Sequence, residues 1–107
     1  MEQYNIIVSK RVRKDLRGIR DSVATVSMSP LSTTRTLDKI VGTINKLDVA
    51  PERGRVLGQT KSGNNVRTLK ANKSYTLLFT VNNHRRIVRV NRVLYGRRNI
   101  TMHDIKD

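Results

Sequence analysis

Residues 75–95 read YTLLFTVNNHRRIVRVNRVLY, and this stretch decides the fold. The segment 82–85 contains two Asn residues, which tolerate positive φ, so it is a good hairpin turn between two antiparallel strands. The second of these strands covers residues 87–95. The first strand carries apolar side chains at alternate positions, a period of two that is typical of a strand: Tyr75, Leu77, Phe79 and Val81.

Toward the N-terminus the pattern predicts two further strands. Residues 66–71 form a third strand of the meander, and residues 58–65 are polar and contain glycine, so they are predicted to be a loop. At the start of the chain, residues 4–8 are a short β-branched run that predicts a strand. Ser9 follows this run in the position of a helix N-cap.

Two amphipathic helices are predicted between the first strand and the meander. Apolar residues recur there at steps of three and four, which places them on one face of a helix. Ser29 and Pro30 separate the helices, because the residue before a proline is pushed out of the α region. The first apolar stripe, which leaves a basic outer face, is Val12, Leu16, Ile19, Val23 and Val26. The second is Leu37, Ile40, Val41, Ile44 and Leu47.

The order of these elements predicts an α+β fold in one domain that spans residues 1–107. The N-terminal strand and a two-helix hairpin pack on a mostly antiparallel sheet, which a C-terminal three-stranded meander completes. One face of the sheet is expected to pack on the helices. The other face is expected to present charge, because Arg89 and Asn91 alternate with apolar residues along the last strand.

Positive charge is concentrated in the second half of the chain. The net charge is +14, and residues 53–103 hold twelve Lys and Arg but no Asp or Glu. Solvated surfaces usually mix both signs, so this asymmetry points to a polyanionic partner. The chain has no Cys and only two His, which argues against thiolate and zinc sites. No metal or other cofactor is expected, and the apolar runs are too short for a signal peptide or a membrane span, so we expect a cytoplasmic protein.

Two groups of basic residues are the candidates for binding a nucleic-acid backbone. The planar guanidinium fork of Arg matches phosphate oxygens, and several such groups on one sheet face would hold a phosphate chain. For Arg89 and Arg92, each taken singly, covering its own strand with the alkyl stem is an equally good explanation. The candidates are Arg67, Lys70 and Lys73 around one strand, and Arg85, Arg86, Arg89, Arg92, Tyr95 and Arg98 along and after the last strand.

His103 is the candidate for proton transfer. It follows the basic residues of the last strand in a tail that can fold back over the sheet, and an imidazole can act as general acid or base on a ribose hydroxyl or a leaving oxygen. An exposed histidine with no chemical role is the competing explanation.

Seven segments, in this order and spacing, resemble the RelE/ParE toxin superfamily. They are IVS (7–9), KDL (14–16), IRD (19–21), SPL (29–31), PERGR (51–55), YTLLF (75–79) and RVLYGRRNI (92–100). The resemblance covers almost the whole chain and agrees with the predicted order of strands and helices. It implies the toxin of a type II toxin-antitoxin system, with an acidic antitoxin as partner.

The resemblance implies two alternative activities. RelE-like members cut mRNA in the ribosomal A site without a metal, and ParE-like members inhibit DNA gyrase without cutting nucleic acid. On the RelE alternative, Arg97 matches the arginine after the last strand, and His103, six residues later, matches a tail Tyr or His. These two are then the catalytic residues. Thr76 departs from that branch, where an Arg usually stands, and the segments around Asp15 and Pro51 look more like ParE sequences.

The charge favours the ribosome as the target, because ribosomal RNA is a dense polyanion. The sequence therefore predicts an mRNA endoribonuclease that depends on the ribosome and inhibits translation. The alternatives are a ParE-like inhibitor of DNA gyrase and a non-catalytic module that binds nucleic acid.

Overall fold

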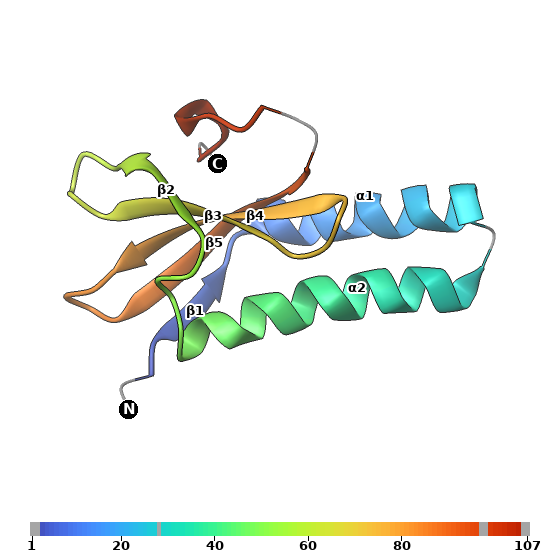
Figure 1. The fold of residues 1–107 in the computed structure, drawn as a ribbon, viewed down its shortest axis with the longest axis horizontal. Helices are drawn as coiled ribbons and strands as arrows, with labels where there is room; N and C mark the ends of the chain where they lie inside the picture. The colour runs from blue at the N-terminus through green and yellow to red at the C-terminus, as the bar shows by residue number, and fades with distance from the viewer. Residues whose placement is uncertain (1–2, 28, 97–98, 106–107) are drawn as a thin grey trace.

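The chain folds as a strand, two helices and a four-stranded meander (Figure 1). The computed structural model describes residues 3–27, 29–96 and 99–105. The strands are β1 (Asn5–Val8), β2 (Arg55–Gln59), β3 (Asn65–Lys70), β4 (Tyr75–Asn82) and β5 (Ile87–Tyr95). The helices are α1 (Lys10–Ser27) and α2 (Pro30–Asn45), with short 3-10 turns η1 (Lys46–Asp48) and η2 (Met102–Ile105).

The five strands form one mixed sheet in the order β1-β5-β4-β3-β2. β1 pairs in parallel with β5, and all other neighbours are antiparallel. The predicted fold class is confirmed, and β5 has the predicted bounds. The sheet has one strand more than the sequence pattern predicted, because β2 lies partly where a loop was expected. β2 is a short edge strand with a register shift between Val56 and Gly58, so it lacks the alternation by which strands are recognised.

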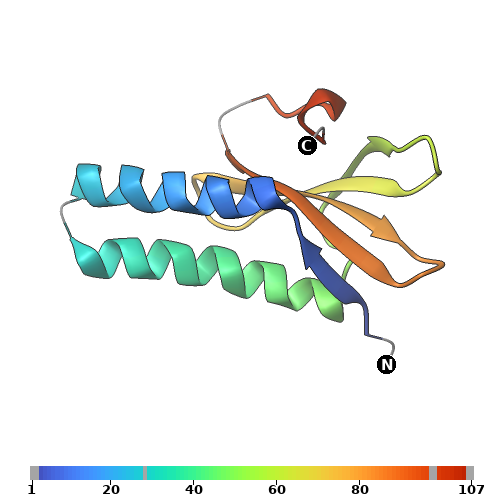
Figure 2. The same cartoon turned by 180° about the vertical axis from the view of Figure 1, so that it is seen from behind.

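Serine caps begin both helices. The Ser9 hydroxyl accepts a hydrogen bond from the backbone N–H of Val12 and donates one to the Asn91 carbonyl, so it also ties α1 to β5. The Ser29 hydroxyl accepts from the N–H of Ser32, and Pro30 occupies the first turn of α2. The helices run side by side and extend past the sheet (Figures 1 and 2).

The main core lies between the helices and one face of the sheet. Ile19, Ile40 and Ile44 from the helices meet Leu77 and Phe79 of β4 there. Leu16 is only half-buried and packs against the edge of this core. The apolar periods of two and 3.6 that predicted the elements therefore also predicted most of the side chains that hold them together.

The other face of the sheet carries a second, smaller apolar cluster. Val66, Leu78 and Leu94 are buried there beneath the C-terminal tail, which contributes Ile100 and Met102. The expectation that this face presents charge was therefore wrong for its central part. The tail supplies the cover that the sequence pattern did not reveal. The tail packs closely on β2 here, since a Cβ added at Gly58 would lie 2.9 Å from the sulfur of the Met102 side chain.

Strand β5 is irregular where it meets α1. Leu78 of β4 pairs with Arg92, and Phe79 pairs with Val90, so Asn91 is an extra residue in β5. The Asp15 carboxylate of α1 accepts a hydrogen bond from the Val93 N–H at this place, 3.0 Å away. This irregularity turns Val93 toward the main core and Leu94 toward the second cluster. Within the described part of the chain, no helix has the length and apolar character that crossing a membrane requires.

Candidate functional site

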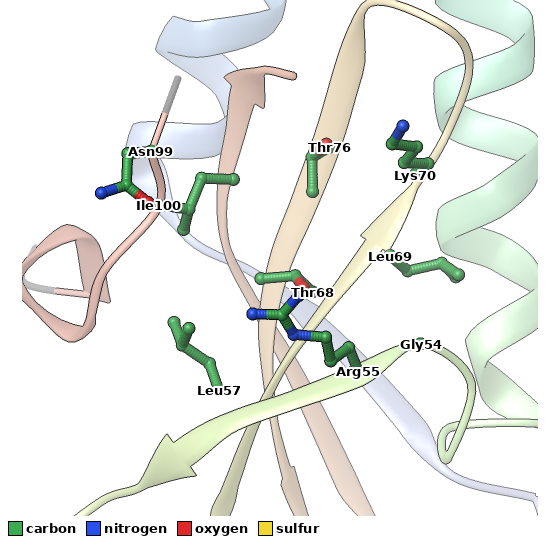
Figure 3. Close-up of a pocket in the computed structure, with 9 residues that line it drawn as sticks. All are labelled: Gly54, Arg55, Leu57, Thr68, Leu69, Lys70, Thr76, Asn99 and Ile100. Carbon is green, nitrogen blue, oxygen red and sulfur yellow. The ribbon is translucent and has the colours of Figure 1, made fainter. Parts of the chain in front are cut away.

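An open cavity of about 520 Å³ lies between the β2–β4 part of the sheet and the C-terminal tail (Figure 3). In Figure 3 the Arg55 side chain reaches into this space from β2, and Leu57 lies toward the tail side. Among the described residues, the lining is Gly54, Arg55, Leu57, Thr68, Leu69, Lys70, Thr76, Asn99 and Ile100. The cavity is therefore built from three adjacent strands and one segment distant in sequence.

The turn before β2 positions Arg55. Gly54 has φ of +82°, a left-handed conformation that favours glycine, and a Cβ at this position would collide with the Thr68 carbonyl oxygen. The Arg67 guanidinium fixes the same turn, since its Nη1 donates to the carbonyl oxygens of Glu52 (3.0 Å) and Gly54 (3.3 Å). Arg67 thus acts as a structural support for this wall of the cavity.

The cavity offers two cations and two hydroxyls. Arg55 and Lys70 supply positive charge, and Thr68 and Thr76 supply hydroxyl groups. This set can bind a phosphate or a carboxylate. No imidazole, carboxylate or phenol is present among the lining residues that the structure describes. Among the described residues, no three His, Asp or Glu side chains gather in a way that could hold a metal ion.

Of the predicted nucleic-acid ligands that the structure describes, only Lys70 lines this cavity. Arg67 lies beside it as a support. Lys73 and Arg85 are exposed in the loop before β4 and the turn before β5, and Arg86 stands in that turn with φ of +57°. Arg89 is half-buried on β5. The structure thus distributes these residues over several places.

Arg92 forms an ion pair with Asp15. Its Nε and Nη2 donate to the two carboxylate oxygens at 2.9 and 3.0 Å, and each side chain is only 14% exposed. The hydrogen bond to Asp15 raises the pKa of Arg92, and the nearby charge of Asp104 acts in the same direction. Its guanidinium fork is thus directed to a carboxylate of its own chain, contrary to the exposed orientation expected from the sequence.

Tyr95 lies outside the cavity. Its ring meets that of Tyr75 edge to face, with centroids 6.0 Å apart, at a second hollow of about 430 Å³ beside the helical hairpin. Val23 and Val26 of α1 also line this hollow. Tyr95 therefore lines the hollow beside the helical hairpin and not the cavity that contains Arg55 and Lys70.

The described part of the chain holds one member of the predicted catalytic pair, so the pair stays a prediction. Arg97, together with the predicted ligand Arg98, lies outside the described residues. His103 is exposed on η2 and does not line the cavity. Its backbone N–H donates to the Thr101 hydroxyl. The tail instead brings Asn99 and Ile100 to the cavity wall.

Sequence reasoning missed Arg55, Thr68, Asn99 and Ile100 as lining residues. Arg55 follows Gly54 directly, and a strand after such a turn would have placed its side chain on the sheet. For the two tail residues there was no signal in the pattern, because their position depends on packing against the second cluster.

The comparisons with known proteins agree with one another. A sequence model described as the ParE toxin of the type II toxin-antitoxin system parDE matches residues 6–100. No curated protein sequence matches the chain. A solved structure of the chromosomal ParDE system from P. aeruginosa is similar, with a TM-score of 0.68 and 19% identity over 87% of this chain and 96% of that one. The structure of the RelBE2 toxin-antitoxin complex from Mycobacterium tuberculosis is also similar, with a TM-score of 0.57 and 16% sequence identity. The similarity covers 89% of this chain and 93% of that one.

Proposed function

We propose that this protein acts by inhibiting DNA gyrase without cutting nucleic acid. The chain belongs to the ParE toxin family and is the toxin component of a type II toxin-antitoxin system. The sequence alone had favoured the ribosome-dependent nuclease. The proposal reverses this order and rests on the chemistry of the cavity.

The observation that carries the proposal is the composition of the cavity wall. Metal-free RNA cleavage needs groups that take a proton from the 2′-hydroxyl and give one to the leaving oxygen. The described lining residues include no imidazole or carboxylate, Lys70 is the one amine among them, and the His103 side chain lies elsewhere on η2. Inhibition of a protein target requires binding groups only, and the match to the ParE model supports that branch.

An acidic antitoxin is the partner that neutralises the protein in this proposal. The net charge of +14 would attract a segment rich in Asp and Glu that folds as it binds. The hollow beside Tyr75 and Tyr95 would receive apolar side chains of that segment, because exposed Val26 and Tyr95 border it. The two similar structures are toxin-antitoxin systems, which supports such a partner.

The second candidate is the ribosome-dependent endoribonuclease, with ribosome and mRNA as partners. Arg55 and Lys70 favour it, because two cations in one open cavity can stabilise the charge of a phosphate in the transition state. Arg97 and His103 would remain its catalytic residues, and the tail would have to bring His103 to the phosphate. Lys73 and Arg85, the other Lys and Arg candidates that are exposed among the described residues, would bind the RNA backbone.

Induced expression in bacterial cells separates the two activities. We expect filamentation and a DNA damage response before protein synthesis declines, because a poisoned gyrase breaks DNA first. The measurement is a damage-responsive reporter followed together with amino-acid incorporation, with the antitoxin co-expressed as control. Immediate collapse of incorporation with a silent reporter would contradict gyrase inhibition and support the nuclease.

A further inference from the structure

The outer face of α1 carries an uninterrupted row of cations. Lys10, Arg13, Lys14 and Arg17, here called the α1 basic stripe, are all exposed. Their spacing of i, i+3, i+4 and i+7 places them within about 100° of arc on one side of the helix. The core residues Val12 and Ile19 lie on the far side. The backbone of α1 packs beside α2 and against β5 (Figure 2), and Lys14 of the stripe borders a hollow that is also lined by Arg92 and Tyr95 of β5.

Among the residues that the structure describes, no acidic side chain forms an ion pair with this stripe, although Asp21 lies at i+4 from Arg17. Asp15, the only acid between positions 10 and 20, is turned to Arg92 of β5. Asp21 lies one turn further along and is paired with Arg20 at 3.3 Å. None of the four cations of the stripe forms an ion pair with a residue that the structure describes.

The stripe works against the stability of its own helix. Lys10 and Lys14, and likewise Arg13 and Arg17, are like charges at i, i+4, and such pairs destabilise a helix. A face that served only for solubility would avoid this cost by mixing both signs. A polyanion bound along the helix would remove the repulsion.

We propose that the α1 basic stripe binds the phosphate backbone of duplex DNA. At a rise of about 1.5 Å per residue, Lys10 and Arg17 are about 10 Å apart along the helix axis. A duplex carries one negative charge per about 1.7 Å of its axis with both strands counted, so about three phosphates of each strand lie along this length. The stripe contains no apolar side chain. Protein interfaces have an apolar centre, whereas backbone phosphates require only cations and hydrogen-bond donors.

This site is separate from the cationic cavity and goes beyond the proposed inhibition of gyrase. It would give the toxin a contact to the DNA on which gyrase acts. Binding to a DNA duplex is measured without gyrase. The proposed DNA contact can therefore fail while gyrase inhibition holds, and gyrase inhibition can fail while the DNA contact holds.

Fluorescence anisotropy with a short labelled DNA duplex tests the proposal. The stripe variant Arg13→Gln, Lys14→Gln, Arg17→Gln is compared with a control of equal charge change, Arg35→Gln, Lys39→Gln, Lys61→Gln, whose positions are exposed elsewhere. Each phosphate contact contributes about 0.9 to the slope of log K against log salt. We expect the stripe variant to lose about 2.7 of this slope (three contacts at about 0.9 each) and the control to lose less than one contact.

Three results would overturn the assignment. The wild-type protein could fail to bind the duplex, or both variants could lose the same slope, which would mean attraction by net charge alone. In a parallel titration with poly-L-glutamate, the stripe variant could lose its affinity for the polypeptide while its affinity for DNA is unchanged. The stripe would then be a site for an acidic protein segment.

Discussion

At the scale of single residues, the ion pair between Asp15 and Arg92 joins the helical layer to the sheet. Three donors converge on the Asp15 carboxylate, from the Arg92 side chain and the Val93 N–H, at 2.9 to 3.0 Å. Bidentate pairs of this kind are strong and directional. This pair lies at the irregular part of β5, where Asn91 has no partner in β4. The pair therefore ties the irregular part of β5 to α1.

Replacing Asp15 by Ala should destabilise the protein by about 3 kcal/mol, because it leaves the largely buried Arg92 guanidinium without its partner. The measurement is the free energy of unfolding from urea titration. Asp21→Ala is the matched control, since its pair with Arg20 is mostly exposed, at 55% for Arg20 and 72% for Asp21, and should cost less than about 1 kcal/mol. Equal losses in the two variants would contradict the role given to Asp15.

The residues of the site were predictable only in part. Lys70 was found because a basic residue at the end of a strand is visible in the sequence. Arg92 was assigned to nucleic acid because its partner Asp15 is 77 residues away, and no local pattern shows such a pair. Arg55 was missed because the strand that carries it was not recognised.

At the scale of elements, the turn that leads into β2 shapes the cavity. Gly54 and Gly63 both have positive φ, at +82° and +87°, but their surroundings differ. Gly54 packs on the backbone of β3 at Thr68, whereas nothing lies within 4 Å of the Cβ position of Gly63. Substitution of Gly63 therefore tests the cost of the left-handed conformation alone. Substitution of Gly54 adds the steric cost of a side chain against the Thr68 backbone.

Gly63→Ala should cost only the left-handed conformation of a residue with a Cβ, about 1–2 kcal/mol. Gly54→Ala should cost clearly more, because the turn must also move away from the Thr68 carbonyl group. Thermal unfolding of the two variants under the same conditions measures the difference. If Gly54→Ala proves as stable as Gly63→Ala, the turn does not hold Arg55 in the way described.

The elements themselves were predicted where a long periodic pattern exists. β4, β5 and both helices follow from apolar periods of two and 3.6, and the caps Ser9 and Ser29 mark the helix starts. The elements that were not predicted, β2 and the C-terminal tail, are short and depend on tertiary contacts. β2 exists by pairing with β3, and the tail is ordered by apolar contacts with residues of three different strands, Val66, Leu78 and Leu94.

At the scale of the whole molecule, three groups of basic residues stand out among those that the structure describes. Arg55 and Lys70 line the cavity, the stripe covers the outer face of α1, and Lys73 and Arg85 stand in exposed turns. Net charge in the sequence indicated a polyanionic partner but could not show this division, because it depends on which acid turns inward. Asp15 is used internally, so α1 is far more basic on its surface than its composition suggests.

Gyrase supercoiling with the purified toxin tests the central claim most directly. The toxin is added to gyrase, ATP and relaxed plasmid, and in parallel to ribosomes stalled on mRNA, with antitoxin added back as the control for specificity. We predict that supercoiling is blocked, that the antitoxin restores it, and that the ribosome-bound mRNA stays intact. Cleavage of the mRNA in the A site with supercoiling unaffected would contradict the account.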